Sequence, residues 1–415
     1  MKYLLLLIGV CAAPLGACLW DTDTLAQESA GMPDVKVVIV GGFARNPDLY
    51  YEMRLERVSK LLAEDADNLE AYDDAGVACS RLGRNDEAIE WMEKKKAAMD
   101  RMGYAETEQP NHHYRYCANL GTFYVHRWFQ DGATMDALVD LEAGRDLSAQ
   151  ALEENPDAHF GREKYQLKFI DWVLTKPHYY DESDPAKEAG QRRGWIPNFL
   201  DLGKTDRFMP STSDNDHLKE MGLEDAITGL CGLITLGAAW ESVDAFYTLA
   251  LLLQIDGRSA FAYFALLRVK ELLEDGKHFF ASEVPLTPEG ITDAEFSFLR
   301  FPTKDKSGAT AEFLALRRKA DEWQDARAEY VVTRMLEGRH PDTDSDFWDD
   351  FEGDPERMEV PAGAIYGAGG AVNAVLQSDW FWILMIFVGG SFLMILYYIY
   401  SKRRNRRLAT TRYSH

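Results

Sequence analysis

The chain has 415 residues, of which 45 are lysine or arginine and 68 are aspartate or glutamate. Without Lys2 and the six basic residues after Tyr400, the remainder carries a net charge of about −30, and such a surface repels nucleic acid and anionic lipid. Nucleic acid is therefore the least expected partner. Three widely spaced cysteines, Cys79, Cys117 and Cys231, fall in helix-like segments and indicate small buried side chains, not a disulfide framework.

Residues 1–17 have the order of a secretory signal: a basic start, an apolar run over residues 3–10 and small side chains before Cys18. The apolar run is too short to span a membrane, so the segment predicts export. Leu-Gly-Ala-Cys at residues 15–18 also resembles a bacterial lipobox, in which Cys18 would carry a lipid and begin the mature chain. The alternative is an ordinary signal cut nearby, with Cys18 incidental.

Residues 18–45 are expected to form a separate N-terminal segment ahead of the helical part. Within it, Val37-Val38-Ile39-Val40-Gly41-Gly42 invites comparison with a strand that runs into the glycines of a dinucleotide-binding fold. No third glycine follows at the required spacing, and no acidic residue ends a second strand. A dinucleotide site is therefore not predicted.

Residues 67–95 predict two amphipathic helices joined by a turn. Small or apolar side chains recur at helical spacing from Tyr72, the pattern breaks at Leu82-Gly83-Arg84, and it resumes at Ala88. A similar pattern of small residues returns around Gly121. It returns again at Ala250 and Ala262, which are twelve residues apart, as Gly76 and Ala88 are. Three occurrences in one chain favour a repeat architecture.

These residues resemble the tetratricopeptide repeat (TPR), in which small side chains let the two helices of a hairpin approach closely. The resemblance implies that such contacts form at Gly76, Ala88, Gly121, Ala250 and Ala262. The match is partial, because Lys95 replaces a small residue and because Gly76 and Gly121 are 45 residues apart instead of about 34. A helical domain without repeats is the alternative.

The predicted fold class is all-α: an α-solenoid of TPR-like helical hairpins plus a single C-terminal transmembrane helix. Repeats are expected over 46–175, an irregular connector over 176–218, and a second helical half over 219–337 that ends in a long helix. The complete layout resembles membrane-anchored cell-envelope TPR proteins of planctomycete-type bacteria. No activity comes with that resemblance.

Residues 338–379 are acidic at first and then rich in glycine and alanine, which predicts a flexible stalk. Residues 380–400 carry no charge and are about as long as a membrane-spanning helix. The basic residues of 401–415 place that end in the cytoplasm. We expect a single-pass membrane protein whose bulk lies outside the cytoplasm, in the periplasm.

Two clusters resemble metal sites and fail on inspection. Asp342-Thr343-Asp344-Ser345-Asp346 begins like a calcium loop, but Phe347 and Gly353 occupy the positions of its sharp-turn glycine and its bidentate glutamate. His112 and His113 point in divergent directions on a helix, so a surface or interhelical role is expected. No metal and no other cofactor is predicted.

The chain contains no nucleophile elbow, zinc-protease motif, phosphate loop or haem-attachment motif, so no enzyme is expected. Aromatic side chains cluster in the second repeat, where a minority at the rim of a concave surface would serve as binding anchors. The candidates for protein binding are Tyr114, Tyr116, Trp128 and Phe129. Ordinary packing is the alternative for all four.

The predicted function is a membrane-anchored protein-binding scaffold or assembly factor of the bacterial cell envelope, acting through a TPR groove. Its expected partners are envelope proteins and, through the C-terminal helix, the membrane; a lipid on Cys18 would be a second anchor if the lipobox is used. Two alternatives stay open. One is an envelope enzyme with an unrecognised active site between the helical halves, and the other is a passive structural component.

Overall fold

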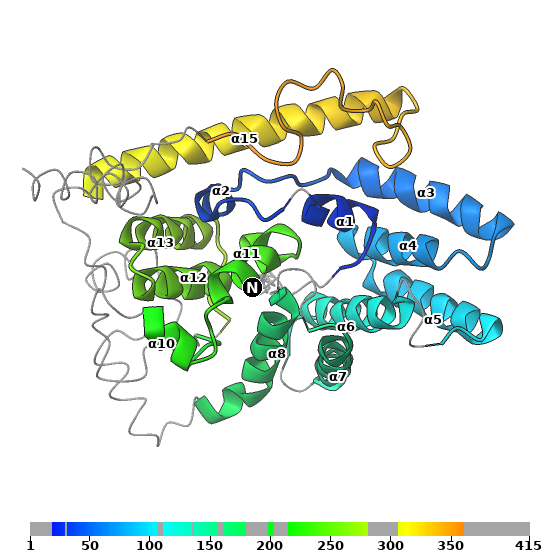
Figure 1. Ribbon diagram of the computed structural model, residues 1–415, viewed down its shortest axis with the longest axis horizontal. Coiled ribbons are helices and arrows are strands. Elements are labelled where there is room, and N and C mark those ends of the chain that lie inside the picture. The colour runs from blue at the N-terminus through cyan, green and yellow to red at the C-terminus, as the bar shows by residue number, and fades with distance from the viewer. Residues whose placement is uncertain are drawn as a thin grey trace, which may run out of the picture. The chain divides into compact units, whose positions relative to one another are not determined.

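The computed structural model describes residues 19–29, 31–105, 111–134, 137–156, 161–179, 198–202, 215–280 and 306–360 (Figure 1). These residues are helical and contain no strand, apart from one isolated antiparallel bridge between Phe43 and Arg357. The all-α class is thereby confirmed. None of the helices within these ranges is long and apolar enough to cross a membrane, and the predicted signal, Cys18, membrane helix and basic tail lie outside them.

The helices keep the labels of Figure 1. Their bounds are α1 (Thr22–Ser29), α2 (Val35–Val40), α3 (Asp48–Glu64), α4 (Leu69–Arg81), α5 (Asn85–Met102), α6 (His112–Gln130), α7 (Val139–Glu154), α8 (Arg162–Tyr179), α10 (Asn215–Glu220), α11 (Ala226–Thr235), the 3₁₀ helix η2 (Ala239–Glu241), α12 (Val243–Ile255), α13 (Ser259–Glu274) and α15 (Lys306–Leu336).

Helices that follow one another in the chain pack against one another. From α3 to α8 each helix contacts the next, α8 then contacts α11, and the order continues through α12 and α13 to α15. The long helix α15 also contacts α3, so the order of contacts returns to its starting helix (Figure 1). The described residues up to Glu359 accordingly belong to one compact unit, and most of the connector predicted over 176–218 lies outside the described ranges.

The N-terminal segment, residues 19–47, is part of the core of this unit. Its helix α2 contacts α11, α13 and α15, and every residue from Val35 to Ala44 is buried. Such burial is far greater than the sequence indicates, because a segment ahead of a repeat array is normally peripheral. Here it supplies apolar surface to helices that are distant in the sequence.

The apolar stretch that resembles a strand is helix α2. The side chain of Asp34 accepts a hydrogen bond from the backbone N–H of Lys36 at the start of the helix, and Gly41 ends it with φ 80° and ψ 25°. Gly41 also lies against Trp240, where an added Cβ would come within 2.4 Å of the indole ring. Burial on all sides and these two end residues outweigh the strand propensity of valine and isoleucine.

The first part of the predicted stalk is folded. Phe347 is fully buried beside Tyr330 of α15, and His340 and Met358 are buried as well. The backbone N–H of Met358 donates to the carbonyl of Gly42, and that of Ala44 to the carbonyl of Glu356, so residues 356–358 pair with the N-terminal segment. The prediction of a flexible stalk is therefore wrong for residues 338–360, because aromatic side chains between the acidic residues are packed against α15. Residues 361–379 lie outside the described ranges.

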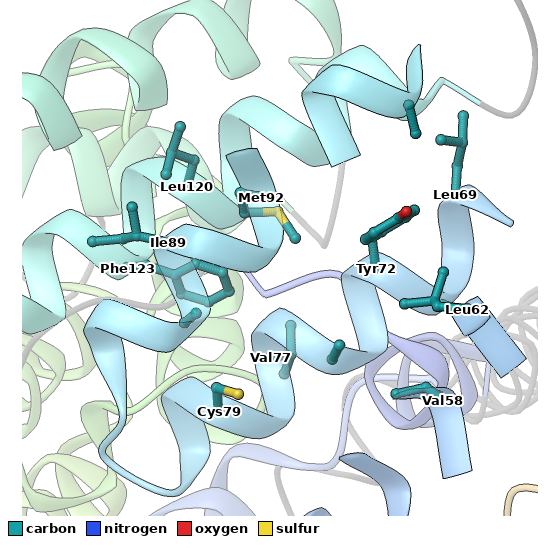
Figure 2. Close-up of a cluster of buried hydrophobic side chains, with 14 of the residues drawn as sticks. Val58, Leu62, Leu69, Tyr72, Val77, Cys79, Ile89, Met92, Leu120 and Phe123 are labelled. Atoms are coloured by element: carbon teal, nitrogen blue, oxygen red, sulfur yellow. The ribbon is translucent and has the colours of Figure 1, made fainter. Parts of the chain in front are cut away.

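The small residues assigned to helix packing lie in helix contacts. An added Cβ on Gly76 would come within 2.9 Å of Met92 and 3.0 Å of Phe123, and one on Gly121 within 3.1 Å of the carbonyl oxygen of Gly144. Ala88, Ala250 and Ala262 are buried on α5, α12 and α13. Figure 2 shows the core that surrounds the first of these contacts, with Met92 and Phe123 beside Ile89 and Leu120.

We expect Gly144→Ala to lower the free energy of unfolding by about 1–3 kcal/mol, because the new methyl group would force α6 and α7 apart. Its Cβ would lie 2.8 Å from the carbonyl oxygen of Gly121 and 2.7 Å from Val125. Urea unfolding of the parent and the variant measures the difference. Gln150→Ala, at an exposed position of the same helix, is the control, and equal stability of all three proteins would contradict the close crossing.

Candidate functional site

Residues 19–22 are bound by polar side chains from three helices, which together we call the segment-binding surface: Asp74 on α4, Tyr114 and Asn119 on α6, and Arg162 on α8. Asn119 accepts a hydrogen bond from the backbone N–H of Trp20 at 2.7 Å and donates one to its carbonyl at 3.1 Å. Arg162 donates to the carbonyl of Leu19 at 3.0 Å. The surface therefore holds the segment by its main chain, as a protein holds a peptide ligand.

The side chain of Trp20 adds an aromatic contact. Its indole N–H donates to the hydroxyl of Tyr114 at 2.9 Å, and the two rings meet edge to face with centroids 5.5 Å apart. The guanidinium of Arg115 lies 5.0 Å from the centroid of the indole ring. Trp20 is thus held by a hydrogen bond, an aromatic contact and a cation, while its neighbour Leu19 is fully buried.

Asn119 is fixed in turn by an ion pair inside the helices. Lys95, fully buried, donates to both oxygens of Asp73 at 2.6 Å, and the Asn119 amide also donates to Asp73 at 3.0 Å. Burial opposes ionisation of Asp73, but the charge of Lys95, together with hydrogen bonds from His112 and Lys95, outweighs burial and lowers the pKa of that carboxyl. Lys95, the residue that departs from the repeat pattern, therefore orients the amide that binds Trp20.

A second polar group, the Arg54 cluster, joins the N-terminal segment to the segment after α15. Arg54 on α3 is fully buried, and its guanidinium lies 2.7 Å from carboxylate oxygens of Asp21, Asp23 and Asp342. Asp342 also contacts Arg57 at 2.7 Å. One buried cation therefore holds carboxylates from both ends of the compact unit.

The three carboxylates of the Arg54 cluster have different pKa values. Burial opposes ionisation of Asp342, but Arg54 outweighs it and lowers the pKa of that carboxyl. The pKa of Asp23 is lowered in the same way. For Asp21, burial and then the nearby charge of Asp23 raise the pKa well above its ordinary value. These pKa shifts follow from the pairing of charged groups inside the cluster. No residue of the cluster lines the small cavity between residues 27–44 and 235–236.

The four aromatic residues predicted as binding anchors lie in the core. Tyr114, Trp128 and Phe129 are buried, with Trp128 and Phe129 against Phe280, and Tyr116 is half-buried. Tyr114 contacts Trp20, which belongs to the same chain. The placement of these four side chains favours ordinary packing over a role in protein binding.

Sequence reasoning missed the residues that hold the segment. Asn119, Arg54 and Trp20 belong to no motif, and their partners lie as far as 288 residues away in the sequence. The available signals were Lys95, a charge at a position where the repeat has a small side chain, and the aspartates that follow Trp20. Neither identifies its partner without the fold.

The groups considered for metal binding separate in the structure. Asp342 pairs with Arg54, whereas Asp344 and Asp346 pair with Arg339, so the three do not converge as a calcium loop would. His112 faces Asp73, whereas His113 contacts Glu154 on α7. Three ligating side chains of different types do meet: one atom each of His113, Cys117 and Glu154 lie within 4.8 Å of one another.

Comparison of the chain with protein-family models, curated proteins and solved structures gives no match. The resemblance to the tetratricopeptide repeat stays a prediction from the sequence. Arguments about function therefore rest on the segment-binding surface and on the residues that support it.

We expect Arg54→Met to lower the free energy of unfolding by about 3–5 kcal/mol, since it leaves Asp21 and Asp23 without their cation and Asp342 with Arg57 alone. Chemical denaturation of the full chain measures this loss. Lys60→Met is the matched control on the same helix, where the side chain is 73% exposed and pairs only with Glu56. An Arg54→Met variant as stable as the control would contradict the structural role of the cluster.

The lowered pKa of Asp342 predicts a specific response to acid. A carboxyl whose pKa is lower in the folded chain contributes stability above its unfolded pKa of about 4, and this contribution is lost as the pH falls through the folded value. Asp342→Asn should therefore lose less stability than the parent between about pH 5 and pH 2.5. Urea unfolding at each pH measures both profiles.

The control for this series is Asp349→Asn, at an exposed position of the same segment. Its profile should follow that of the parent. Asp21, whose raised pKa acts in the opposite direction, is present in all three proteins. Parallel profiles for Asp342→Asn and the parent would show that Asp342 is not ionised in partnership with Arg54.

Proposed function

We propose that the protein is a membrane-anchored protein-binding scaffold or assembly factor of the bacterial cell envelope, exported so that its helical unit lies outside the cytoplasm. The observation that carries this proposal is the binding of residues 19–22 through their main chain by the segment-binding surface. A surface that recognises backbone groups and one aromatic side chain has the chemistry to bind a peptide segment of a partner.

The arrangement of the helices supports a solenoid of TPR-like hairpins. Helix pairs such as α4 with α5 and α6 with α7 pack directly against each other, with small residues at their contacts. Arrays of this kind use one face of successive helices to bind partners. The segment-binding surface draws its residues from α4, α6 and α8, which are alternate helices of the array.

The chemistry of the bound segment defines the partner that we propose. Leu19 and Trp20 supply apolar and aromatic anchors, and Asp21 and Asp23 supply charges for Arg54. A partner segment with an aromatic residue followed by acidic residues would displace residues 19–24 and make the same contacts. The N-terminal segment then acts as an internal competitor that limits binding to partners of sufficient affinity.

We predict that a synthetic peptide of residues 19–29 binds the full chain carrying Trp20→Ala at least tenfold more tightly than it binds the parent. The substitution removes the aromatic anchor of the internal competitor, and loss of such an anchor costs about 2 kcal/mol or more. Fluorescence anisotropy of the labelled peptide measures both affinities. Circular dichroism confirms that the variant keeps its helices.

Two controls make the result specific. The same peptide with alanine in place of Trp20 should not bind, and adding Asn119→Ala to the Trp20→Ala protein should abolish capture, because that amide holds the peptide backbone. A folded Trp20→Ala protein that binds no peptide at about 1 mM would remove the main support for the scaffold proposal.

A further inference from the structure

The contact between α6 and α7 brings together three side chains that ligate metals. His113 and Cys117 are four residues apart on α6, so they project from the same face of that helix. Glu154 is the last residue of α7, which packs against α6 through Gly121 and Gly144. The ligating atoms of all three lie within 4.8 Å of one another, with His113 Nδ1 only 2.6 Å from Glu154 Oε1.

We propose that His113, Cys117 and Glu154 form a binding site for a divalent transition metal, with zinc as the preferred ion. A thiolate, an imidazole and a carboxylate together suit Zn²⁺, and three protein ligands leave a fourth position for water or another ligand. With Cys117 and Glu154 ionised and His113 neutral, the ligands carry two negative charges, which balance those of the ion.

The geometry needs only small side-chain movements to accept the ion. Metal–ligand bonds of about 2.0–2.3 Å in a tetrahedron place the ligand atoms roughly 3.3–3.6 Å apart. The three atoms would therefore draw in from their present limit of 4.8 Å, while the histidine and carboxylate separate slightly from 2.6 Å. The ion would replace the hydrogen bond between these two side chains, and Cys117 would release its proton on binding it.

The surroundings orient the ligands and leave a route to the site. The amide of Asn111 lies 3.5 Å from the second oxygen of Glu154 and helps to set the carboxylate. Cys117 is buried, whereas the side chains of His113 and Glu154 are 13% and 21% exposed. An ion can thus enter from the histidine and glutamate side.

The test is a cobalt titration of the purified full chain after metal has been removed with a chelator. We expect one Co²⁺ per chain, with a near-ultraviolet sulfur-to-cobalt band and the visible bands of a tetrahedral ion, and we expect Zn²⁺ to displace it. Cys117→Ala should abolish the sulfur band. His113→Gln and Glu154→Gln should each weaken binding at least tenfold while the partly exposed positions keep the fold intact.

Cys79→Ala is the matched control, because Cys79 is an equally buried thiol on α4 that lies outside the cluster. It should keep the parent's spectrum, its stoichiometry and the rise in melting temperature that Zn²⁺ produces. Cobalt spectra that are unchanged in Cys117→Ala would overturn the proposal, as would equal affinities in the parent, His113→Gln and Glu154→Gln. Absence of bound cobalt in the parent would also overturn it.

Discussion

The buried guanidinium of Arg54 is the interaction on which the arrangement of this chain depends. It lies on α3, and it contacts Asp21 and Asp23 at the start of the described chain and Asp342 after α15. A buried arginine with one partner missing is costly, so the three segments must be in place together. This requirement explains why residues 338–360 are folded, and why the first and last helices of the array, α3 and α15, lie in contact.

Polar groups specify the position of the N-terminal segment, and apolar burial stabilises it. Residues 35–44 contribute buried surface that any apolar segment of similar volume could supply. The pairing of Asn119 with Trp20 and of Arg54 with the aspartates fixes the register, since a shift by one residue would leave several buried groups without partners. The inner helices therefore select one segment in one position. The same selectivity makes this surface a candidate for recognising a partner.

The sequence predicts the local structure well and the long-range structure poorly. Periodicity locates α4, α5 and the long helix α15, and the glycines at 76 and 121 lie in close helix contacts as their spacing predicts. The sequence indicates a strand-like stretch where α2 lies and a flexible stalk over residues 338–360. Both expectations are wrong, because burial in the tertiary structure determines how these segments fold. The site could not be predicted, since Arg54 and Asp342 are 288 residues apart and no local pattern links them. The metal ligands were within reach, because His113 and Cys117 have helical spacing, but Glu154 joins them only in the fold.

The central claim is that residues 19–24 are an integral part of the helical unit. Amide hydrogen exchange of the full chain, followed by mass spectrometry of its fragments, tests it most directly, because the backbone N–H groups of Trp20, Thr22 and Thr24 all donate to buried side chains. The account predicts that these amides exchange as slowly as those in the middle of α4 and α6. Exchange at the rate of an unstructured peptide would contradict it.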